Sequence, residues 1–318
     1  MDFFIQTILI LAVFAGFGGH NFGVENFAAK AKADVRPEVS IFPHVAPALR
    51  VSPYLPSDAP ELLVSDFTAK SIIVMDEGTG RVLFQKDATL LHPMASLTKL
   101  MAALVWFDID GDLKKDVKIE ARDYREGSIP YFISGDKVKT KDLLYAALVT
   151  SSNSAVAALV RSTGLPEEKF VSFMNAKAAE LGMENTKFAD PIGLSAKNES
   201  TATDLFILAR EAFYNSNISR ATQSASYEFT PAGSGAARII RSTDLLLTSS
   251  FNSGDYKIIG GKTGYIEESD YNLILKIYNK EKNKNIIAVV LGSGGANLRF
   301  TEAKKLIEWT YKNYLWKI

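Results

Sequence analysis

Three short motifs lie in order along the chain and constrain its fold and chemistry more than any other feature. They are Ser96-Leu97-Thr98-Lys99, Ser151-Ser152-Asn153 and Lys262-Thr263-Gly264. Each motif alone is weak, because Ser134–Lys137 repeats the first pattern and Ser250–Asn252 repeats the second. The complete set is typical of enzymes that transfer acyl groups through a serine nucleophile. We therefore begin from an acyl-transfer hypothesis.

The first motif opens a segment with a helical pattern. Leu97–Phe107 consists almost entirely of apolar residues and good helix formers, which predicts a helix over Ser96–Phe107. Ser96 and Lys99 then lie one turn apart on one face, with the hydroxyl and the amine within hydrogen-bonding reach. Ser134 instead precedes a Gly-Asp pair that favours a turn, so we interpret its repeat of the motif as chance.

A serine hydroxyl is a poor nucleophile until a base takes its proton. A lysine can be that base if burial or a second cation lowers its pKa. Lys99 on an apolar helix suits burial, and Lys262 could supply the second positive charge. The N–H groups at the helix start also point toward Ser96, as an oxyanion hole requires. The alternative for this pair alone is an ordinary helix serine beside a solvated lysine.

Glycines flank the third motif. The segment Ile258–Tyr265 predicts a strand whose small residues let a substrate strand lie against its edge. Lys262 and Thr263 would then meet a terminal carboxylate through charge-assisted hydrogen bonds. The alternative is a glycine-rich loop with a surface lysine, and no Walker pattern makes this segment a phosphate loop.

These residues resemble the serine D-alanyl-D-alanine carboxypeptidases, the low-molecular-mass penicillin-binding proteins of peptidoglycan metabolism. The resemblance runs from Leu62 to the C-terminus and includes the segments Asp76–Leu83, Pro93–Met101, Phe188–Leu194, Thr201–Arg210 and Arg299–Trp309. It implies an α/β fold of the β-lactamase/transpeptidase type. In that fold an antiparallel β-sheet is flanked by helices and joined to a mainly helical lobe, with the site in the cleft between the lobes.

The resemblance also implies a role for each motif residue. Ser96 would be the nucleophile, Lys99 its general base, and Ser151 a proton relay. The other implied roles are substrate binding by Asn153, Lys262, Thr263 and Gly264, and an oxyanion hole made by the backbone N–H groups of Ser96 and Tyr265.

The chain departs from the family pattern in several places. Ile266 stands where the family usually has threonine, and Ser269-Asp270 replaces a small Ala-Gly pair. Ser154 stands where the family often has aspartate. Many relatives continue into a β-rich C-terminal domain, whereas this chain stops at Ile318 within or just after a predicted helix. We therefore expect that domain to be absent.

Composition excludes several other classes of function. The chain has 36 basic and 36 acidic residues, so its zero net charge does not support nucleic-acid binding. Without cysteine it has no disulfide, no thiol nucleophile and no thiolate zinc site. The scattered His20, His44 and His92 do not form a metal-binding pattern, and we expect neither metal nor cofactor. His92 lies just before Ser96, but it precedes Pro93 outside the helix, and we interpret it as structural.

The N-terminal region is apolar and then rich in proline. Phe3–Phe17 is short of the ~20 residues that span a bilayer, and Asp2 stands where a signal peptide has positive charge. We expect residues 1–18 to be a signal or membrane anchor, 19–61 a Pro-rich linker, and 62–318 the penicillin-binding catalytic domain. The protein would then work extracytoplasmically, either anchored by the N-terminal segment or secreted after its cleavage.

The first functional interpretation is a D,D-carboxypeptidase that removes the terminal D-Ala of peptidoglycan stem pentapeptides through a Ser96 acyl-enzyme, with β-lactams as covalent inhibitors. An endopeptidase acting on cross-links and a non-catalytic wall-binding homologue remain as alternatives. A β-lactamase is disfavoured, because no Glu-x-x-Asn lies between Ser151 and Lys262 to position a deacylating water.

The expected secondary structure combines hairpins at the two ends of the domain with a helical middle. The hairpins are expected from Ser71–Met75 with Val82–Gln85 and from Tyr271–Tyr278 with Asn285–Leu291. Besides the helix at Ser96, helices are expected at Lys141–Arg161, Glu167–Leu181, Ala202–Tyr214 and Leu298–Tyr311.

Overall fold

The computed structural model of the protein describes residues 52–127 and 129–316. The predicted segment 1–18 and most of the predicted linker lie outside these residues. Within the part described, no helix is both long enough and apolar enough to cross a bilayer. The helices are α2 (Thr98–Ile109), α3 (Thr140–Val149), α4 (Asn153–Ser162), α5 (Glu167–Glu180), α6 (Ala202–Tyr214), α7 (Ser216–Thr222) and α8 (Leu298–Asn313).

The strands form one large sheet and three small ones. The large antiparallel sheet has the order β2-β1-β11-β10-β9, and it brings β1 from the start of the domain beside β11 from its end. Its strands are β1 (Ser71–Asp76), β2 (Val82–Lys86), β9 (Tyr256–Ile266), β10 (Asp270–Asn279) and β11 (Lys284–Ser293). The short pairs are β3 (His92–Pro93) with β6 (Glu199–Ser200), β4 (Asp116–Lys118) with β5 (Lys137–Lys139), and β7 (Ser226–Phe229) with β8 (Arg238–Arg241).

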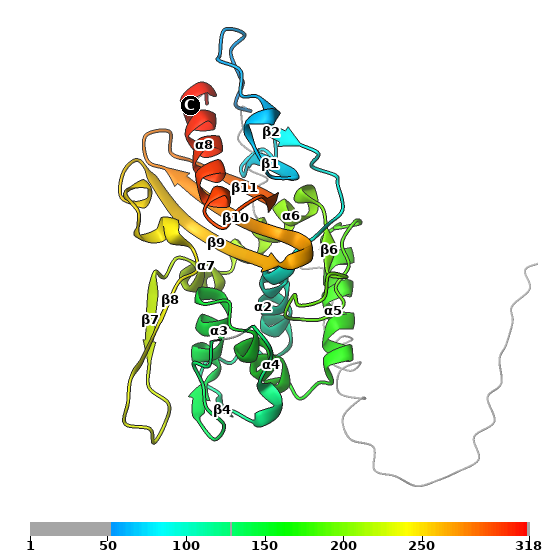
Figure 1. Cartoon of the computed structure of the whole chain (residues 1–318), viewed down its shortest axis with the longest axis vertical. Helices are drawn as coiled ribbons and strands as arrows, with labels where there is room; N and C mark the ends of the chain where they lie inside the picture. Colours follow the sequence, from blue (N-terminus) through cyan, green and yellow to red (C-terminus); the bar gives the residue numbers. More distant parts are fainter. Residues whose placement is uncertain (1–51, 128, 317–318) are drawn as a thin grey trace, which may run out of the picture. The chain divides into compact units, whose positions relative to one another are not determined.

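Helices cover both faces of the large sheet, as Figure 1 shows. Strand side chains alternate between the two faces. Along β1, Ile73 belongs to the core shared with the helical lobe, whereas Ile72 and Val74 belong to the core under α8. The predicted architecture, an antiparallel sheet flanked by helices with a mainly helical lobe, is confirmed.

Helix α2 is the centre of the helical lobe. Every residue from Thr98 to Trp106 is buried, because apolar side chains surround this helix and α3, α4, α5 and α6 pack against it. A helix that is apolar all round is stable only inside a protein. Lys99 lies in this buried stretch, with 1% of its surface exposed.

The predicted helix Lys141–Arg161 is wrong as a single element. It divides into α3 and α4, separated by Thr150–Ser152. Ser151 has a left-handed backbone (φ 60°), which ends α3, and the Ser152 hydroxyl then accepts a hydrogen bond from the Ala155 N–H at 3.3 Å to cap α4. The break places the second motif at a helix junction.

The helix predicted from Ser96 starts later than expected. Ser96 lies in a single 3₁₀ turn, η2 (Ala95–Leu97), and α2 begins at Thr98. Ala95 has a left-handed backbone (φ 48°), an uncommon conformation for a residue with a side chain. The chain therefore turns sharply immediately before the serine of the first motif.

Both predicted hairpins are confirmed, and the chain before them packs onto the sheet domain. The first hairpin turns at Gly78–Gly80, where the Asp76 carboxylate accepts the Thr79 N–H at 2.8 Å. Upstream, Tyr54 pairs with Leu315 in a short antiparallel bridge. Residues placed at the end of the predicted linker thus contact the end of the chain.

We expect Gly260→Ala to destabilise the sheet domain by about 1–3 kcal/mol, because inserting a methyl group into a packed core forces neighbours to shift. A Cβ at Gly260 would lie 2.4 Å from Cγ of Phe213, a buried α6 residue. Urea unfolding followed by circular dichroism measures the change in free energy. Gly254→Ala is the matched control, since its Cβ would come no nearer than 3.9 Å to a heavy atom. Equal stability of the two variants would contradict this packing.

Candidate active site

The three motifs converge at one cleft, although they are far apart in the sequence. The first comes from η2 and α2, the second from the junction of α3 and α4, and the third from β9, which lies along the helical lobe in Figure 1. The cleft has a volume of about 500 Å³. Its lining includes the motif residues Ser96, Ser151, Asn153, Thr263 and Gly264, together with Tyr265.

Lys99 lies under the cleft and connects three segments. Its Nζ donates to Ser96 Oγ at 2.7 Å, to Asn153 Oδ1 at 2.8 Å and to the Ile192 carbonyl at 2.7 Å. Burial lowers the pKa of Lys99 to about 7, against the opposing effect of the Asp190 carboxylate. A substantial fraction of the amine is therefore neutral near neutral pH, and a neutral amine can accept the Ser96 proton.

Lys262 makes the equivalent contact with the second motif. Its Nζ donates to Ser151 Oγ at 2.9 Å and to the Thr263 carbonyl at 2.7 Å. Burial, followed by repulsion from Lys99 and Arg299, holds the pKa of Lys262 well below its ordinary value. An anion bound beside Lys262 would favour the charged ammonium again. The site is therefore electrostatically suited to a negatively charged ligand.

A loop after α5 supplies the third acceptor for Lys99. The Asp190 carboxylate accepts the N–H groups of Ile192 at 2.7 Å and Gly193 at 2.6 Å, as well as Asn198 Nδ2 at 2.7 Å. These bonds fix the loop with the Ile192 carbonyl directed at Lys99. Sequence reasoning gave Asp190 no role, and the only signal was that Phe188–Leu194 resembles a family segment.

Two glycines let backbone segments approach Ser96 closely. A Cβ at Gly264 would lie 2.9 Å from the Met94 carbonyl and 3.3 Å from Ser96 N, so β9 runs directly beside the serine. A Cβ at Gly193 would lie 2.0 Å from the Ala95 carbonyl, which leaves no room for a side chain. The position of Ser96 thus depends on both neighbouring segments.

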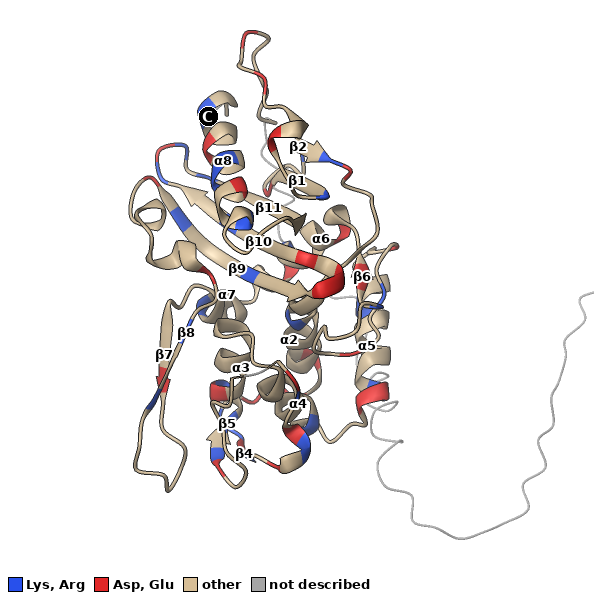
Figure 2. Ribbon diagram, in the orientation of Figure 1, with Lys and Arg blue, Asp and Glu red and all other residues tan. Residues whose placement is uncertain are grey.

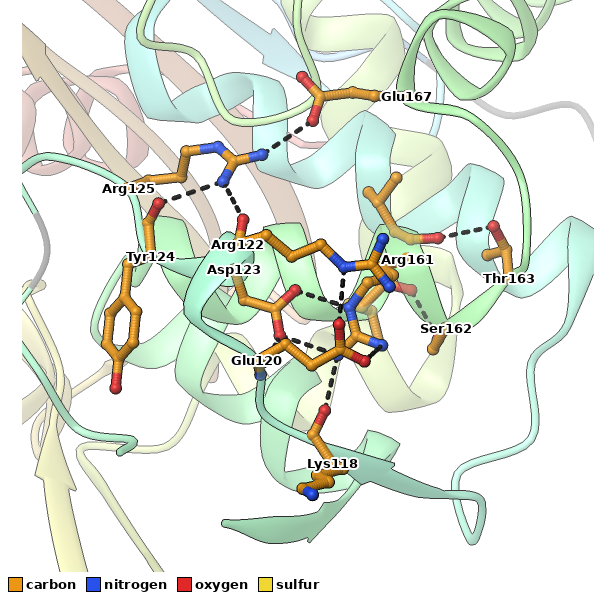
Figure 3. Close-up of polar contacts among 12 residues, drawn as sticks. Lys118, Glu120, Arg122, Asp123, Tyr124, Arg125, Arg161, Ser162, Thr163 and Glu167 are labelled. Atoms are coloured by element: carbon orange, nitrogen blue, oxygen red, sulfur yellow. Dashed lines mark hydrogen bonds and ion pairs between the residues drawn. The ribbon is translucent and has the colours of Figure 1, made fainter. Parts of the chain in front are cut away.

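The loop before β5 is tied to both ends of α4. At the start of the helix, Asn153 Nδ2 donates to the Glu126 carbonyl at 2.6 Å. At its end, Arg161 binds the buried Asp123 through two bonds of 2.7 and 2.8 Å, as Figure 3 shows. Such bidentate pairs are geometrically specific. The contacts at the two ends of α4 fix the loop that carries Gly127, a residue of the cleft wall.

The turn after the third motif is held by hydrogen bonds, but Asp270 in it has a positive φ of 50°, which is uncommon for a residue with a side chain. Ile266 N donates to Ser269 Oγ at 3.1 Å, and the Ser269 hydroxyl donates to the Asp270 carbonyl at 2.9 Å. Strands β9 and β10 stay paired as far as Ile266 and Asp270. Figure 2 shows acidic residues at this turn, and Glu267 and Glu268 line the cleft.

Arg299 at the start of α8 is a cleft residue that sequence reasoning missed. Its side chain lines the cleft, and Nη1 donates to the Gly264 carbonyl at 3.2 Å. The lining also includes Thr243, whose hydroxyl lies 2.6 Å from that of Thr263. The resemblance of Arg299–Trp309 to a family segment was the available signal, but it assigned no role to the arginine.

His92 takes no part in the cleft lining. Its Nε2 lies 2.8 Å from the Ser269 carbonyl in a buried hydrogen bond, and burial lowers its pKa. The structural interpretation of His92 is confirmed. In residues 52–127 and 129–316, no three His, Asp or Glu side chains come together as a metal site requires.

The comparisons with known proteins agree with this geometry. The family described as D-alanyl-D-alanine carboxypeptidase matches residues 57–295. The chain belongs to this family, whose members are serine hydrolases.

Several members of this family are clearly similar to the chain. A D-alanyl-D-alanine endopeptidase of Pseudomonas aeruginosa is 31% identical over 279 residues, which cover 85% of this chain and 86% of the relative. The D-alanyl-D-alanine carboxypeptidase DacF of Bacillus subtilis is 30% identical over 253 residues, covering 77% of this chain and 63% of the relative. The crystal structure of a Streptomyces DD-transpeptidase superposes with a TM-score of 0.71 and 27% identity, covering 80% of this chain and 99% of that chain.

We expect Gly193→Ala to lower stability by about 2–4 kcal/mol, because it adds a clash with the Ala95 carbonyl to the strain of a left-handed alanine. Gly182→Ala isolates the strain alone, since Gly182 is also left-handed (φ 76°) and a Cβ there would meet no atom within 4 Å. That control should lose only about 1 kcal/mol. Urea denaturation of both variants makes the comparison. Equal losses would show that the loop does not press on the Ser96 turn.

Proposed function

We propose that the protein is a D,D-carboxypeptidase that removes the terminal D-Ala from peptidoglycan stem pentapeptides through a Ser96 acyl-enzyme. The observation that carries the proposal is the contact of 2.7 Å between Ser96 Oγ and the Nζ of Lys99, a buried lysine whose pKa lies near 7. A serine beside such an amine is activated for acyl transfer. Family membership supports the same activity.

In the first half-reaction, Ser96 Oγ attacks the carbonyl carbon of the penultimate D-Ala while Lys99 takes the hydroxyl proton. The backbone N–H groups of Ser96 and Tyr265 stabilise the oxyanion of the tetrahedral intermediate. Collapse breaks the peptide bond, and the leaving amine receives a proton through Ser151. Water then hydrolyses the acyl-enzyme ester and restores Ser96.

Substrate binding uses the remaining groups of the cleft. Asn153, held between Lys99 and the Glu126 carbonyl, contacts the substrate amide. Gly264 lets the substrate backbone lie close to β9. Lys262 and Thr263 bind the free carboxylate of the terminal D-Ala, and Arg299 adds a second cation at the same end of the cleft. A neutral substrate end would leave these groups without an anion.

An endopeptidase that opens cross-links is the second candidate. It is favoured by the 31% identity with the Pseudomonas aeruginosa relative, which is named an endopeptidase. Both activities would use the same acyl-enzyme. They differ in whether the leaving group is a free D-Ala or an amino acid embedded in a second stem.

The proposed site of action is extracytoplasmic, where peptidoglycan and β-lactams are both found. Residues 1–18 would serve as a signal or membrane anchor and the start of the predicted linker 19–61 as a spacer, while the end of that linker belongs with the catalytic domain, since Tyr54 pairs with Leu315. Peptidoglycan stems would be the partners, and β-lactams would acylate Ser96 covalently because they mimic the D-Ala-D-Ala end.

Labelling by a fluorescent penicillin should fall about tenfold per pH unit below pH 7, because protonated Lys99 cannot accept the Ser96 proton. The rate should level off above pH 7, where the amine is neutral. Ser96→Ala should take up no label, and peptide mapping should place the wild-type label on Ser96. A label on another serine, or a rate independent of pH between 5 and 8, would refute the assigned base and nucleophile.

Pentapeptide stems should release D-Ala faster than cross-linked dimers are opened, because only the pentapeptide presents a small, free carboxylate to Lys262 and Thr263. Chromatography of both substrates with one enzyme preparation measures the two rates. Lys262→Ala should raise the KM for the pentapeptide at least tenfold. Faster opening of the dimer would assign the protein as an endopeptidase.

A further inference from the structure

Arg299 is a cation at the cleft that the Asp244 carboxylate influences from a distance, since it opposes the lowering of the Arg299 pKa by burial. In residues 52–127 and 129–316 no acidic side chain lies within ion-pair distance of its guanidinium, and its buried Nε has no hydrogen-bond partner. Its polar contact with the protein is the bond of 3.2 Å from Nη1 to the Gly264 carbonyl. With this hydrogen bond alone, the long and flexible Arg299 side chain would lose conformational entropy on binding an anion, which would weaken the binding.

Two aromatic rings hold the Arg299 guanidinium in addition to its hydrogen bond with Gly264. The Arg299 guanidinium lies 5.4 Å from the centroid of the Tyr271 ring and 4.8 Å from that of Phe300, both within cation–π range. Phe300 is a core residue next to Arg299 in the sequence. Tyr271 comes instead from β10, so its contact links α8 to the sheet.

Tyr271 is itself fixed by the strand that carries the third motif. It pairs with Tyr265 across β9 and β10, and the two rings stack with centroids 4.5 Å apart. Cross-strand aromatic pairs stabilise each other in a sheet. Tyr265 lines the cleft. Tyr271 therefore contacts both a residue of the cleft wall, Tyr265, and the cation Arg299.

We propose that Tyr271 is a positioning residue for carboxylate recognition: its ring holds the Arg299 guanidinium at the cleft, ready for the substrate's terminal carboxylate. This inference rests on the proposed function and deepens it. Tyr271 does not touch the substrate and acts only through Arg299. Its effect is therefore confined to substrates whose end is negatively charged.

Two peptides that differ only at the C-terminus test this role. One is an acylated D-Ala-D-Ala peptide with a free carboxylate, and the other is its C-terminal amide. For wild type we expect a clear preference in kcat/KM for the free carboxylate. Tyr271→Ile, whose side chain suits a strand, should reduce this preference about tenfold through KM, while kcat on the amide stays within about twofold.

Tyr271→Phe is the matched control, because it keeps the ring and its stacking and loses only the hydroxyl. It should retain the wild-type preference. With Arg299→Ala already present, Tyr271→Ile should change the preference less than twofold, since the group it positions is gone. Tyr271→Leu serves as a second variant if Tyr271→Ile does not fold, as judged by its thermal midpoint.

The outcomes separate this inference from the proposed function. If wild type labels at Ser96 and prefers the free carboxylate, but Tyr271→Ile keeps that preference, the positioning role of Tyr271 is wrong and the function stands. Loss of the preference in Tyr271→Phe as well would also overturn the role of the ring. If wild type does not distinguish the two peptides, the carboxylate pocket and the inference fail together.

Discussion

The site depends on one buried amine. Lys99 is held on a helix that is apolar all round, and its Nζ donates to acceptors from η2, α4 and the loop fixed by Asp190. Moving an amine out of water lowers its pKa, because burial disfavours the charged form. The same burial that stabilises the helical lobe therefore produces the proton acceptor that Ser96 requires. The stability of the lobe and the basicity of Lys99 thus both depend on the burial of α2.

The cleft brings three basic side chains together in a small volume. Lys99, Lys262 and Arg299 lie close enough for Lys99 and Arg299 both to lower the pKa of Lys262. The Asp244 carboxylate opposes this repulsion, but burial raises its own pKa to about 6. A substrate carboxylate that enters the cleft would add the negative charge that Lys262 and Arg299 favour. The cleft is thus complementary to an anionic peptide end.

Local signals predicted much of the fold. The two hairpins and the helices α5, α6 and α8 follow from turn residues and apolar periodicity over short windows. The division between α3 and α4 was missed because apolar residues continue on both sides of the polar run Thr150–Ser154, although Ser and Asn are typical N-cap residues. The chain turns there through the left-handed Ser151, whose hydroxyl accepts a hydrogen bond from Lys262 Nζ, 111 residues away. Periodicity within one window does not report such a contact.

The sequence by itself determined the identity of the motif residues and, through their order and spacing, the family. It also determined that no cysteine chemistry takes part. Only the tertiary structure decided the pKa of Lys99, the anchoring of its loop by Asp190, and the placement of Arg299 beside Gly264 and Tyr271. These properties arise from burial and from contacts such as the one between Lys99 and Ile192, 93 residues apart. A pKa or a side-chain position depends on everything packed around it, and that environment exists only once the chain has folded.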